Sequence, residues 1–124
     1  MRVMVMVKGT KESEAGVMPG KELLETMGAY NQQLIAAGIM KDGAGLKPTS
    51  RGARVHFSGK DRSVSSGPFN TGRESDILSG FWIWEVKSLD EAIAWAKKCP
   101  NPMPGPSDLE IRPFYEMEDF ADIK

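Results

Sequence analysis

Two segments of this sequence carry apolar side chains on both faces of a β-strand. They are MRVMVMVK (residues 1–8) and GFWIWEVK (residues 80–87), in which valine or tryptophan alternates with methionine, phenylalanine or isoleucine. Because successive side chains of a strand point to opposite faces, this pattern predicts interior strands that are covered on both sides. Any fold for this chain must therefore provide two covering layers.

Two helices are predicted between strands. The first begins near Pro19 and ends at about Ala37, because apolar residues recur there at helical spacing and Gly38 follows as a C-terminal cap. The second begins at Ser88, where Ser-Leu-Asp-Glu is a capping box, and ends at Cys99 before a proline. Each helix has one apolar stripe that can cover a sheet.

Three weaker strand signals complete the order of elements. Residues 39–46 predict a short edge strand with a bulge, because Gly43 and Gly45 interrupt it. Residues 53–58 and 63–66 predict a hairpin around the turn 59–62, and a long loop follows over 67–76. Residues 109–115 predict the last strand, and the acidic tail from Glu116 to Asp122 is expected to pack loosely.

The order β, α, β, hairpin, β, α, β predicts an α+β fold with one domain over residues 1–124. It matches a ferredoxin-like βαββαβ sheet with an inserted hairpin. Two helices cover one face of such a sheet, so rows of Trp or of Val and Met would stay exposed on the other face. A second copy of the chain is the simplest cover, which predicts a homodimer in the form of a small α/β barrel.

The composition argues against several kinds of partner. The 16 Lys and Arg nearly balance the 17 Asp and Glu, without a run of like charges, so no direct binding of nucleic acid or of an anionic membrane is expected. Cys99 is the lone cysteine, and no apolar run approaches the ~18 residues of a membrane helix. The opening residues have the pattern of a strand rather than a signal peptide, so we expect a cytoplasmic protein.

Metal and cofactor chemistry have little support in the residue types. His56 is the only histidine and lies in a predicted hairpin strand, so a Ser-His-Asp or Cys-His apparatus would depend on it alone. One His and one Cys make no zinc site of ordinary composition. The glycines at 43 and 45 lack the rest of a phosphate-binding motif. We therefore predict neither a metal nor a cofactor.

Asp42 and Tyr30 are the candidate catalytic residues. Asp42 follows the first helix at the start of a glycine-containing strand, where its carboxyl can point into the gap between helix and sheet and act as an acid or base. A solvated turn aspartate fits the pattern equally. Tyr30 lies one helical face away and can lend its hydroxyl to the same gap, although it also fits the helix stripe as a core aromatic.

Four residues are candidate ligand contacts. Phe69, Arg73 and Glu74 belong to the long central loop, and Trp82 belongs to the second apolar strand. Charged loop residues can bind an anionic or polar ligand, but they are more often only solvated. Trp82 can wall a pocket, but packing in the core or in a dimer interface explains it better.

The chain also resembles the YciI-related proteins, specifically their DGPF-motif branch. The motifs that carry the resemblance are SSGPF (65–69), GFWIW (80–84), SLDEA (88–92), AWA (94–96) and EIRP (110–113), together with the opening strand and residues 36–48. The resemblance implies a dimeric ferredoxin-like α/β barrel and a family of largely undefined activity. Since members of this branch are often linked with extracytoplasmic-function sigma factors, it also implies a regulatory role.

Two departures limit what the resemblance carries. The aspartate of the DGPF motif is Ser66 here, and the acidic residues that usually follow it map onto Thr71 and residues 73–76 in a loop about two residues longer. In the sister YciI branch a helix histidine and a strand aspartate form the proposed catalytic pair. Asp42 matches the aspartate, but the histidine position falls near Tyr30, so a His–Asp mechanism is not expected.

Two functions stay open from the sequence. The preferred one is a dimer that binds a small molecule or regulates a partner, with its pocket between the first helix and the sheet. The alternative is a cofactor-independent enzyme in which Asp42 acts as acid or base on a small polar or aromatic substrate while Tyr30 orients it.

Overall fold

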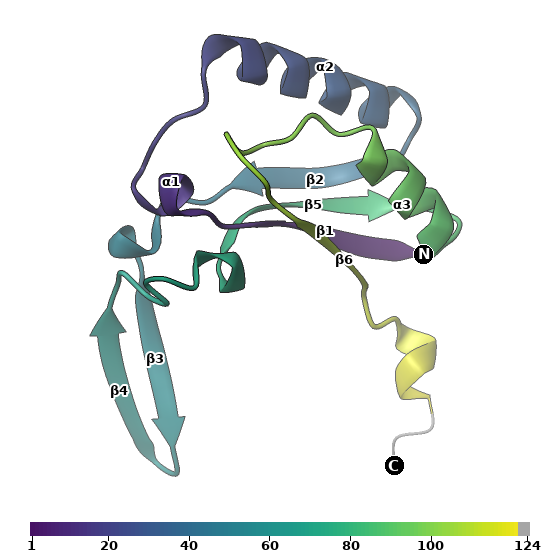
Figure 1. Cartoon of the computed structure of the whole chain (residues 1–124). Coiled ribbons are helices and arrows are strands. Elements are labelled where there is room, and N and C mark those ends of the chain that lie inside the picture. Colours follow the sequence, from purple (N-terminus) through teal and green to yellow (C-terminus); the bar gives the residue numbers. More distant parts are fainter. Residues whose placement is uncertain (122–124) are drawn as a thin grey trace.

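A four-stranded antiparallel sheet forms the centre of the molecule. The computed structural model describes residues 1–121, and its main sheet has the strand order β2-β5-β1-β6 (Figure 1). The strands are β1 (Arg2–Lys8), β2 (Met40–Gly45), β5 (Leu78–Glu85) and β6 (Leu109–Pro113). This is the order of a split βαβ ferredoxin-like sheet, so the predicted α+β class is confirmed.

Two helices cover the same face of this sheet. They are α2 (Lys21–Ala36), which Figure 1 shows above the strands, and α3 (Leu89–Lys97). Residues of both helices belong to the same core as the buried strand residues. The Ser88 side chain caps α3 by accepting a hydrogen bond from the backbone N–H of Glu91. A capping box also needs the Glu91 side chain to accept a hydrogen bond from the backbone N–H of Ser88. In the structure it accepts from the backbone N–H of Lys87, one residue earlier, so only the Ser88 half of the predicted capping box is confirmed.

The core fills the space between the helices and the sheet. Val3 pairs with Trp84 and Val5 with Trp82 on adjacent strands, and all four side chains lie on the helix side. Val3, Val5 and Trp84 are fully buried there. Burying such side chains contributes roughly 1.5–3 kcal/mol each, so this layer is a major source of stability.

The edge strand β2 has the irregularity that its glycines predict. Its pairing with β5 shifts register between Met40 and Asp42, which marks a bulge. A Cβ atom added at Gly43 would lie 2.9 Å from Cδ1 of Trp82 and 3.1 Å from Cε of Met40. Glycine is therefore required at this position because the Trp82 ring lies directly against the backbone.

The predicted hairpin is present but stands apart from the main sheet. It consists of β3 (Ala53–Ser58) and β4 (Asp61–Ser66), which pair only with each other and whose residues are all exposed. Its turn has two residues, Gly59 and Lys60, instead of the predicted four, and Gly59 adopts the positive φ of 58° that such a turn needs. The hairpin projects below the sheet, on the side without helices (Figure 1).

Four short helical segments connect these elements. They are α1 (Lys11–Glu14) and the 3₁₀ turns η1 (Thr49–Arg51), η2 (Glu74–Asp76) and η3 (Met117–Phe120). The segment α1 was not predicted, since its four residues have no apolar period and depend on the reciprocal cap between Thr10 and Ser13. The acidic tail contains η3, while Asp122 lies outside the described residues.

Candidate functional site

Asp42 lies on the sheet face that the helices leave uncovered. It pairs with Ile83, whereas its neighbour Gly43 pairs with Trp82 on the helix side. Residues that pair directly across two strands share a face, so the Asp42 side chain is directed away from α2. It is exposed, and its Oδ1 accepts a hydrogen bond of 2.8 Å from the backbone N–H of Gly43. The predicted position of Asp42, in a gap between helix and sheet, is wrong because the bulge after Met40 shifts the pairing by one residue.

Tyr30 and Trp82 are core residues on the opposite face. Both are buried, and their rings meet edge to face with centroids 6.2 Å apart. The Tyr30 hydroxyl donates a 2.6 Å hydrogen bond to the carbonyl of Trp95, and Nε1 of Trp82 donates to the Asn31 side chain. Burial raises the pKa of the Tyr30 hydroxyl well above its ordinary value. Neither ring is free to contact a ligand, and the sheet separates Tyr30 from Asp42.

The other three candidates lie at the base of the hairpin. The Arg54 guanidinium stacks over the Phe69 ring at 4.0 Å, and Nη2 of Arg73 lies 2.8 Å from Oδ2 of Asp76. Glu74 is the first residue of η2, and its backbone carbonyl lies against Gly9. A Cβ atom added to Gly9 would be 2.6 Å from that carbonyl oxygen. Glu74 thus contacts the residue after β1, whereas Phe69 and Arg73 make these contacts within the hairpin and the loop, and all three are separate from Asp42.

A network of backbone contacts explains the glycine of the SSGPF motif. Glu14 accepts hydrogen bonds from the backbone and the hydroxyl of Thr49, whose Oγ1 accepts from the backbone N–H of Phe69. A Cβ atom on Gly67 would lie 1.8 Å from the Thr49 carbonyl oxygen, so no larger residue fits. Ser66, at the position of the motif aspartate, pairs with Ala53 at the base of the hairpin and is exposed. In this chain the motif fixes the hairpin to the body.

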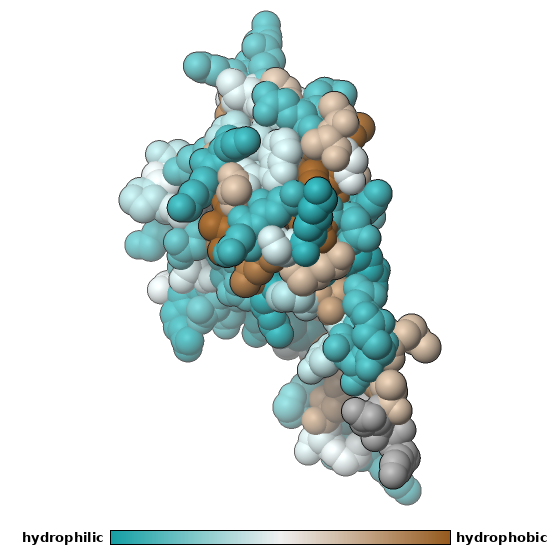
Figure 2. Space-filling model, turned by 90° about the vertical axis from the view of Figure 1, so that its right-hand side faces the viewer, coloured by the Kyte–Doolittle hydropathy of each residue, from teal (hydrophilic) through white to brown (hydrophobic). Residues whose placement is uncertain are grey.

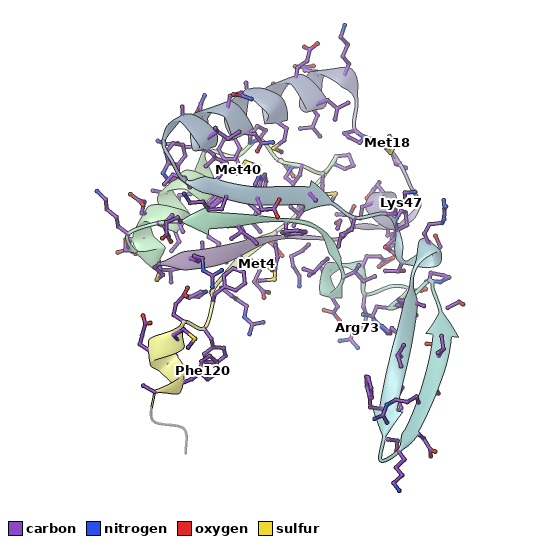
Figure 3. The ribbon with its side chains drawn as sticks, turned by 180° about the vertical axis from the view of Figure 1, so that it is seen from behind. Met4, Met18, Met40, Lys47, Arg73 and Phe120 are labelled. Carbon is purple, nitrogen blue, oxygen red and sulfur yellow. The ribbon has the colours of Figure 1, made fainter. Side chains whose placement is uncertain are left out.

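The open face, as we call the sheet surface away from the helices, has an apolar centre and a charged edge. The pairings place the following residues on it: Met4, Met6, Phe81 and Ile83 at the centre, and Asp42, Lys8, Glu110 and Arg112 around them. Figure 3 shows Met4 on this side of the sheet and Met40 on the other. Met6 is buried and the other three central residues are half-buried within one chain. The Met row expected on the uncovered face is present as Met4 and Met6, whereas the expected exposure of Trp or Val there is wrong, because the helices cover those rows.

The charged edge is only partly neutralised by pairs. Lys8 lies along the sheet with its Nζ 3.7 Å from Oε1 of Glu110, and its side chain is only 19% exposed. Arg112 and Asp42 form no ion pair with another residue of the described chain. The open face thus offers a carboxylate on its β2 edge and a guanidinium on its β6 edge, three strand spacings or about 14 Å apart across the apolar centre. Either edge suits a small molecule that has one polar group for the charge and an apolar part for the centre.

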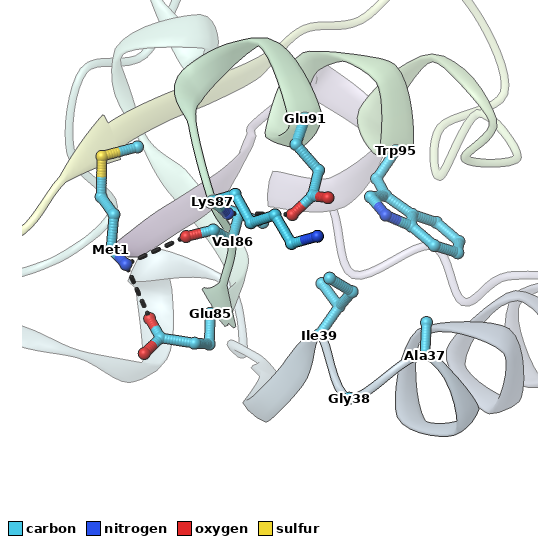
Figure 4. A pocket seen from close by; sticks show the side chains of 9 residues that line it. All are labelled: Met1, Ala37, Gly38, Ile39, Glu85, Val86, Lys87, Glu91 and Trp95. Atoms are coloured by element: carbon cyan, nitrogen blue, oxygen red, sulfur yellow. Dashed lines mark hydrogen bonds and ion pairs between the residues drawn. The ribbon is translucent and has the colours of Figure 1, made fainter.

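A surface depression lies elsewhere, between the end of α2 and the start of α3. Its volume is about 530 Å³, and Figure 4 shows Ala37, Gly38 and Ile39 on one side and Glu91 and Trp95 on the other. Figure 2 shows this side of the molecule, where small apolar patches lie among hydrophilic atoms. The volume is that of a ligand site, but the depression is open to solvent.

The polar groups of this depression are already engaged. The Met1 amino group donates to the Val86 carbonyl and pairs with Glu85 at 3.2 Å, while Glu91 accepts from the Lys87 backbone. The ammonium of Lys98 lies 4.8 Å from the centre of the Trp95 ring. Few groups are left to recognise a ligand, so the open face is the stronger candidate.

The described residues supply no ready metal site or thiol nucleophile. Within residues 1–121 no three His, Cys, Asp or Glu side chains are grouped so that they could hold an ion. Burial raises the pKa of the Cys99 thiol to about 11, which disfavours the reactive thiolate. No helix in the same range is long and apolar enough to cross a membrane.

The chain belongs to the family of proteins with a YCII-related domain. The family model matches residues 1–115, nearly the whole chain and all four strands of the main sheet. The chain is also 30% identical to the uncharacterized protein R00369 of Rhizobium meliloti (strain 1021) over 93 residues, which cover 75% of this chain and 73% of the relative. The predicted family resemblance is confirmed, and neither comparison names an activity, a ligand or a sigma factor.

Sequence reasoning missed most residues of the open face. Lys8, Glu110 and Arg112 come from β1 and β6, whose adjacency is decided by the order of strands in the sheet and not by any local pattern. Alternation along residues 109–115 does separate Glu110 and Arg112 from the apolar Leu109 and Ile111, which was the one available signal. The residues around the depression have no signal of their own, because two helix ends meet there.

Proposed function

We propose that this protein is a homodimer that binds a small polar molecule against the open face of its sheet and serves as a binding or regulatory protein. The observation that carries the proposal is the open face itself, whose centre is apolar while its opposite face is closed by helices. Two such faces packed together would cover both apolar centres with one symmetric interface.

A second copy packed on the open face would also exclude water from the proposed binding site. On a single chain Asp42 and Arg112 stand on an open surface, where water competes for every polar contact. A partner sheet would enclose them, and charge-assisted hydrogen bonds gain strength as water is excluded. The ligand class that fits is a small molecule with a hydrogen-bond donor for Asp42 and an apolar part for the centre of the face, because Arg112 lies about 14 Å away on the opposite edge strand.

A cofactor-independent enzyme is the second candidate, and the position of Asp42 favours it. In the dimer the carboxylate would lie in the enclosed space beside bound substrate, where it can accept a proton. Tyr30 has no part in this version, since it lies behind the sheet with its hydroxyl bonded to Trp95. The regulatory version, including a link to a sigma-factor system, is supported by the family resemblance and not by the geometry of the site.

Light scattering tests the dimer. We expect the mass of two chains at micromolar concentration and the mass of one chain for Ile83→Asp, which places a charge at the centre of the interface. Leu24→Asp is the matched control, because Leu24 is 58% exposed on the outer side of α2 and should leave the dimer intact. A monomeric wild type, or an Ile83→Asp variant that stays dimeric, contradicts the proposal.

A thermal-shift screen of metabolites followed by calorimetry tests the binding site. A ligand that stabilises the protein should bind Asp42→Asn at least roughly tenfold more weakly, since the loss of a charge-assisted hydrogen bond costs about 1.5–3 kcal/mol. Asp90→Asn, at an exposed position of α3, is the control and should bind as the wild type does. Equal affinity for all three proteins would exclude Asp42 as a contact, and turnover that survives in Asp42→Asn would exclude it as the acid or base.

A further inference from the structure

We infer that the β3–β4 hairpin of one protomer docks against the C-terminal arm of its partner, where the C-terminal arm is residues 114–121. This inference rests on the proposed homodimer and adds to it the residues that hold the two copies together and the orientation of the two-fold axis. Neither element takes part in the core of its own chain, because all residues of the hairpin and nearly all of the arm are exposed or half-buried.

The hairpin and the C-terminal arm flank the open face at opposite ends. In Figure 1 both project below the sheet, the hairpin beyond one end of the strands and η3 beyond the other, and Figure 3 shows the same arrangement from behind. The topology requires it, since β6 runs antiparallel to β1 and ends beside Arg2, whereas the hairpin joins the sheet near the start of β5. A second sheet placed on the open face would therefore lie between the two projections.

Both elements carry apolar side chains with nothing to cover them. On the hairpin, Val55 pairs directly with Val64, and Val64 is 70% exposed. On the arm, the rings of Tyr115 and Phe120 meet at a tilt of 42° with centroids 5.2 Å apart, and Met117 is 86% exposed. In Figure 2 the C-terminal segment stands out below the body of the molecule. A two-stranded hairpin alone is only marginally stable in water, so each patch favours contact with another surface.

The charges of the two elements are opposite. The hairpin carries Arg54, Lys60 and Arg62 against one acidic residue, whereas residues 116–120 contain three acidic side chains and no basic one. None of the three hairpin cations forms an ion pair within the described chain. Hairpin against hairpin would bring like charges together, and hairpin against arm brings opposite charges together, so complementarity selects the second arrangement.

The open face has a limited footprint. Four strands spaced about 4.8 Å apart and about 20 Å long cover a flat area of roughly 400 Å². The hairpin and the arm are exposed elements at its two ends, so both can extend an interface that is centred on this face.

The choice of arm fixes the symmetry of the dimer. When two sheets pack face to face, the two-fold axis lies in the plane between them. An axis along the strands places like ends together, and an axis across the strands places each hairpin beside its partner's C-terminal arm. Of these two directions, the second is the one that brings opposite charges and the two apolar patches to the same end of the dimer.

The base of each element is held firmly enough to act as a docking surface. Thr49 and Gly67 fix the hairpin through the contacts described above. The arm is held where Arg2 pairs with Glu116 at 3.1 Å and lies over the Phe114 ring. Because both elements are fixed in the single chain, little conformational freedom is lost when they dock.

Charge exchange is the first test. Lys60→Glu and Glu118→Lys alter exposed residues, and each should raise the dimer dissociation constant roughly tenfold, since every dimer contains two copies of the contact. The double variant should return to within about threefold of the wild type. Lys97→Glu on α3 is the matched control and should leave the constant unchanged. Single variants that dimerise normally, or a double variant that does not recover, would overturn the docking.

Cross-linking separates this inference from the proposed dimer. In a Cys99→Ala background, a flexible bis-maleimide should link chains that carry both Val64→Cys and Met117→Cys, but not chains with either change alone. Linkage of the Val64→Cys variant with itself, or a dimer by light scattering that the double variant cannot link, overturns the hairpin–arm contact and leaves the proposed dimer standing. A monomeric wild type overturns both.

Discussion

The two faces of the central sheet are built from the same strands but differ in burial. On the helix side, Val3 and Trp84 are fully buried in one continuous core. On the open face, Met4 and Ile83, which are next to Val3 and Trp84 in the sequence, are only half-buried and lie beside charged residues. Neighbouring residues of one strand therefore serve two purposes: one side chain stabilises the core, and the next lies on the face that we propose for a partner and a ligand.

This difference shows why the open face is the better place for function. A packed core tolerates few changes, since its side chains fill the space between helix and sheet. Asp42 and Arg112 lie on the face that has no such constraint, yet they stand on strands that the core holds rigid. Rigid support with exposed chemistry is the usual arrangement of a binding site.

The largest expected loss of stability comes from a cavity in the core on the helix side of the sheet. Trp84→Ala removes the largest fully buried side chain, so we expect the free energy of unfolding to fall by roughly 3–5 kcal/mol. The measurement is denaturant unfolding at one fixed protein concentration, because the proposed dimer would make the stability depend on concentration. Leu24→Ala, on the exposed side of α2, should cost well under about 1 kcal/mol. Equal losses for the two variants would contradict the assignment of the core to the helix side.

The fold was largely predictable because its signals are periodic. Alternation in residues 1–8 and 80–87, the helical spacing from Leu23 to Leu34 and the Ser88 cap each depend on neighbouring residues, and the structure confirms them. The position of Asp42 was not predictable in the same way. The bulge after Met40 moves the side chains of the later β2 residues to the opposite face of the sheet. No local sequence pattern shows at which residue this bulge begins.

The candidate site was harder still to predict, because its parts are distant in sequence. Lys8 and Glu110 meet only because β1 and β6 are neighbours. Tyr30 was predicted correctly as a residue of the helix stripe, but its hydrogen bond to Trp95 depends on where α3 packs. Such contacts follow from tertiary packing, and single-sequence patterns carry no record of them.

A smaller effect is expected where the helix side approaches the backbone of β2. Gly43→Ala introduces a Cβ 2.9 Å from the Trp82 ring and should cost roughly 1–3 kcal/mol, because the ring must move within a packed core. Gly45 is the matched control two residues along the same strand, with no atom within 4 Å of the added carbon. Gly45→Ala should change stability by less than about 0.5 kcal/mol. If both variants lose the same stability, close packing is not the reason for glycine at position 43.

The smallest expected effect concerns Tyr30, and it distinguishes a structural hydroxyl from a catalytic one. Tyr30→Phe leaves the Trp95 carbonyl without its 2.6 Å hydrogen bond, so unfolding should become easier by about 1 kcal/mol. Ligand binding at the open face should not change, because Tyr30 lies behind the sheet. A lost affinity in Tyr30→Phe would place the hydroxyl in the site after all.

The pH dependence of the same variant provides a second readout. Burial raises the pKa of Tyr30 above its ordinary value of 10.0, so the folded state keeps this proton at a pH where the unfolded chain begins to release it. The unfolded state then gains from ionisation, and the stability contributed by Tyr30, complete below about pH 10, declines as the pH rises further. The comparison is made in a Cys99→Ala background, because the buried Cys99 thiol also has a raised pKa and would add its own decline in the same pH range. In that background Tyr30→Phe should lack the decline. Tyr115→Phe is the control, since Tyr115 is 76% exposed and should retain the wild-type profile. If the decline survives in Tyr30→Phe, the buried hydroxyl is not its source.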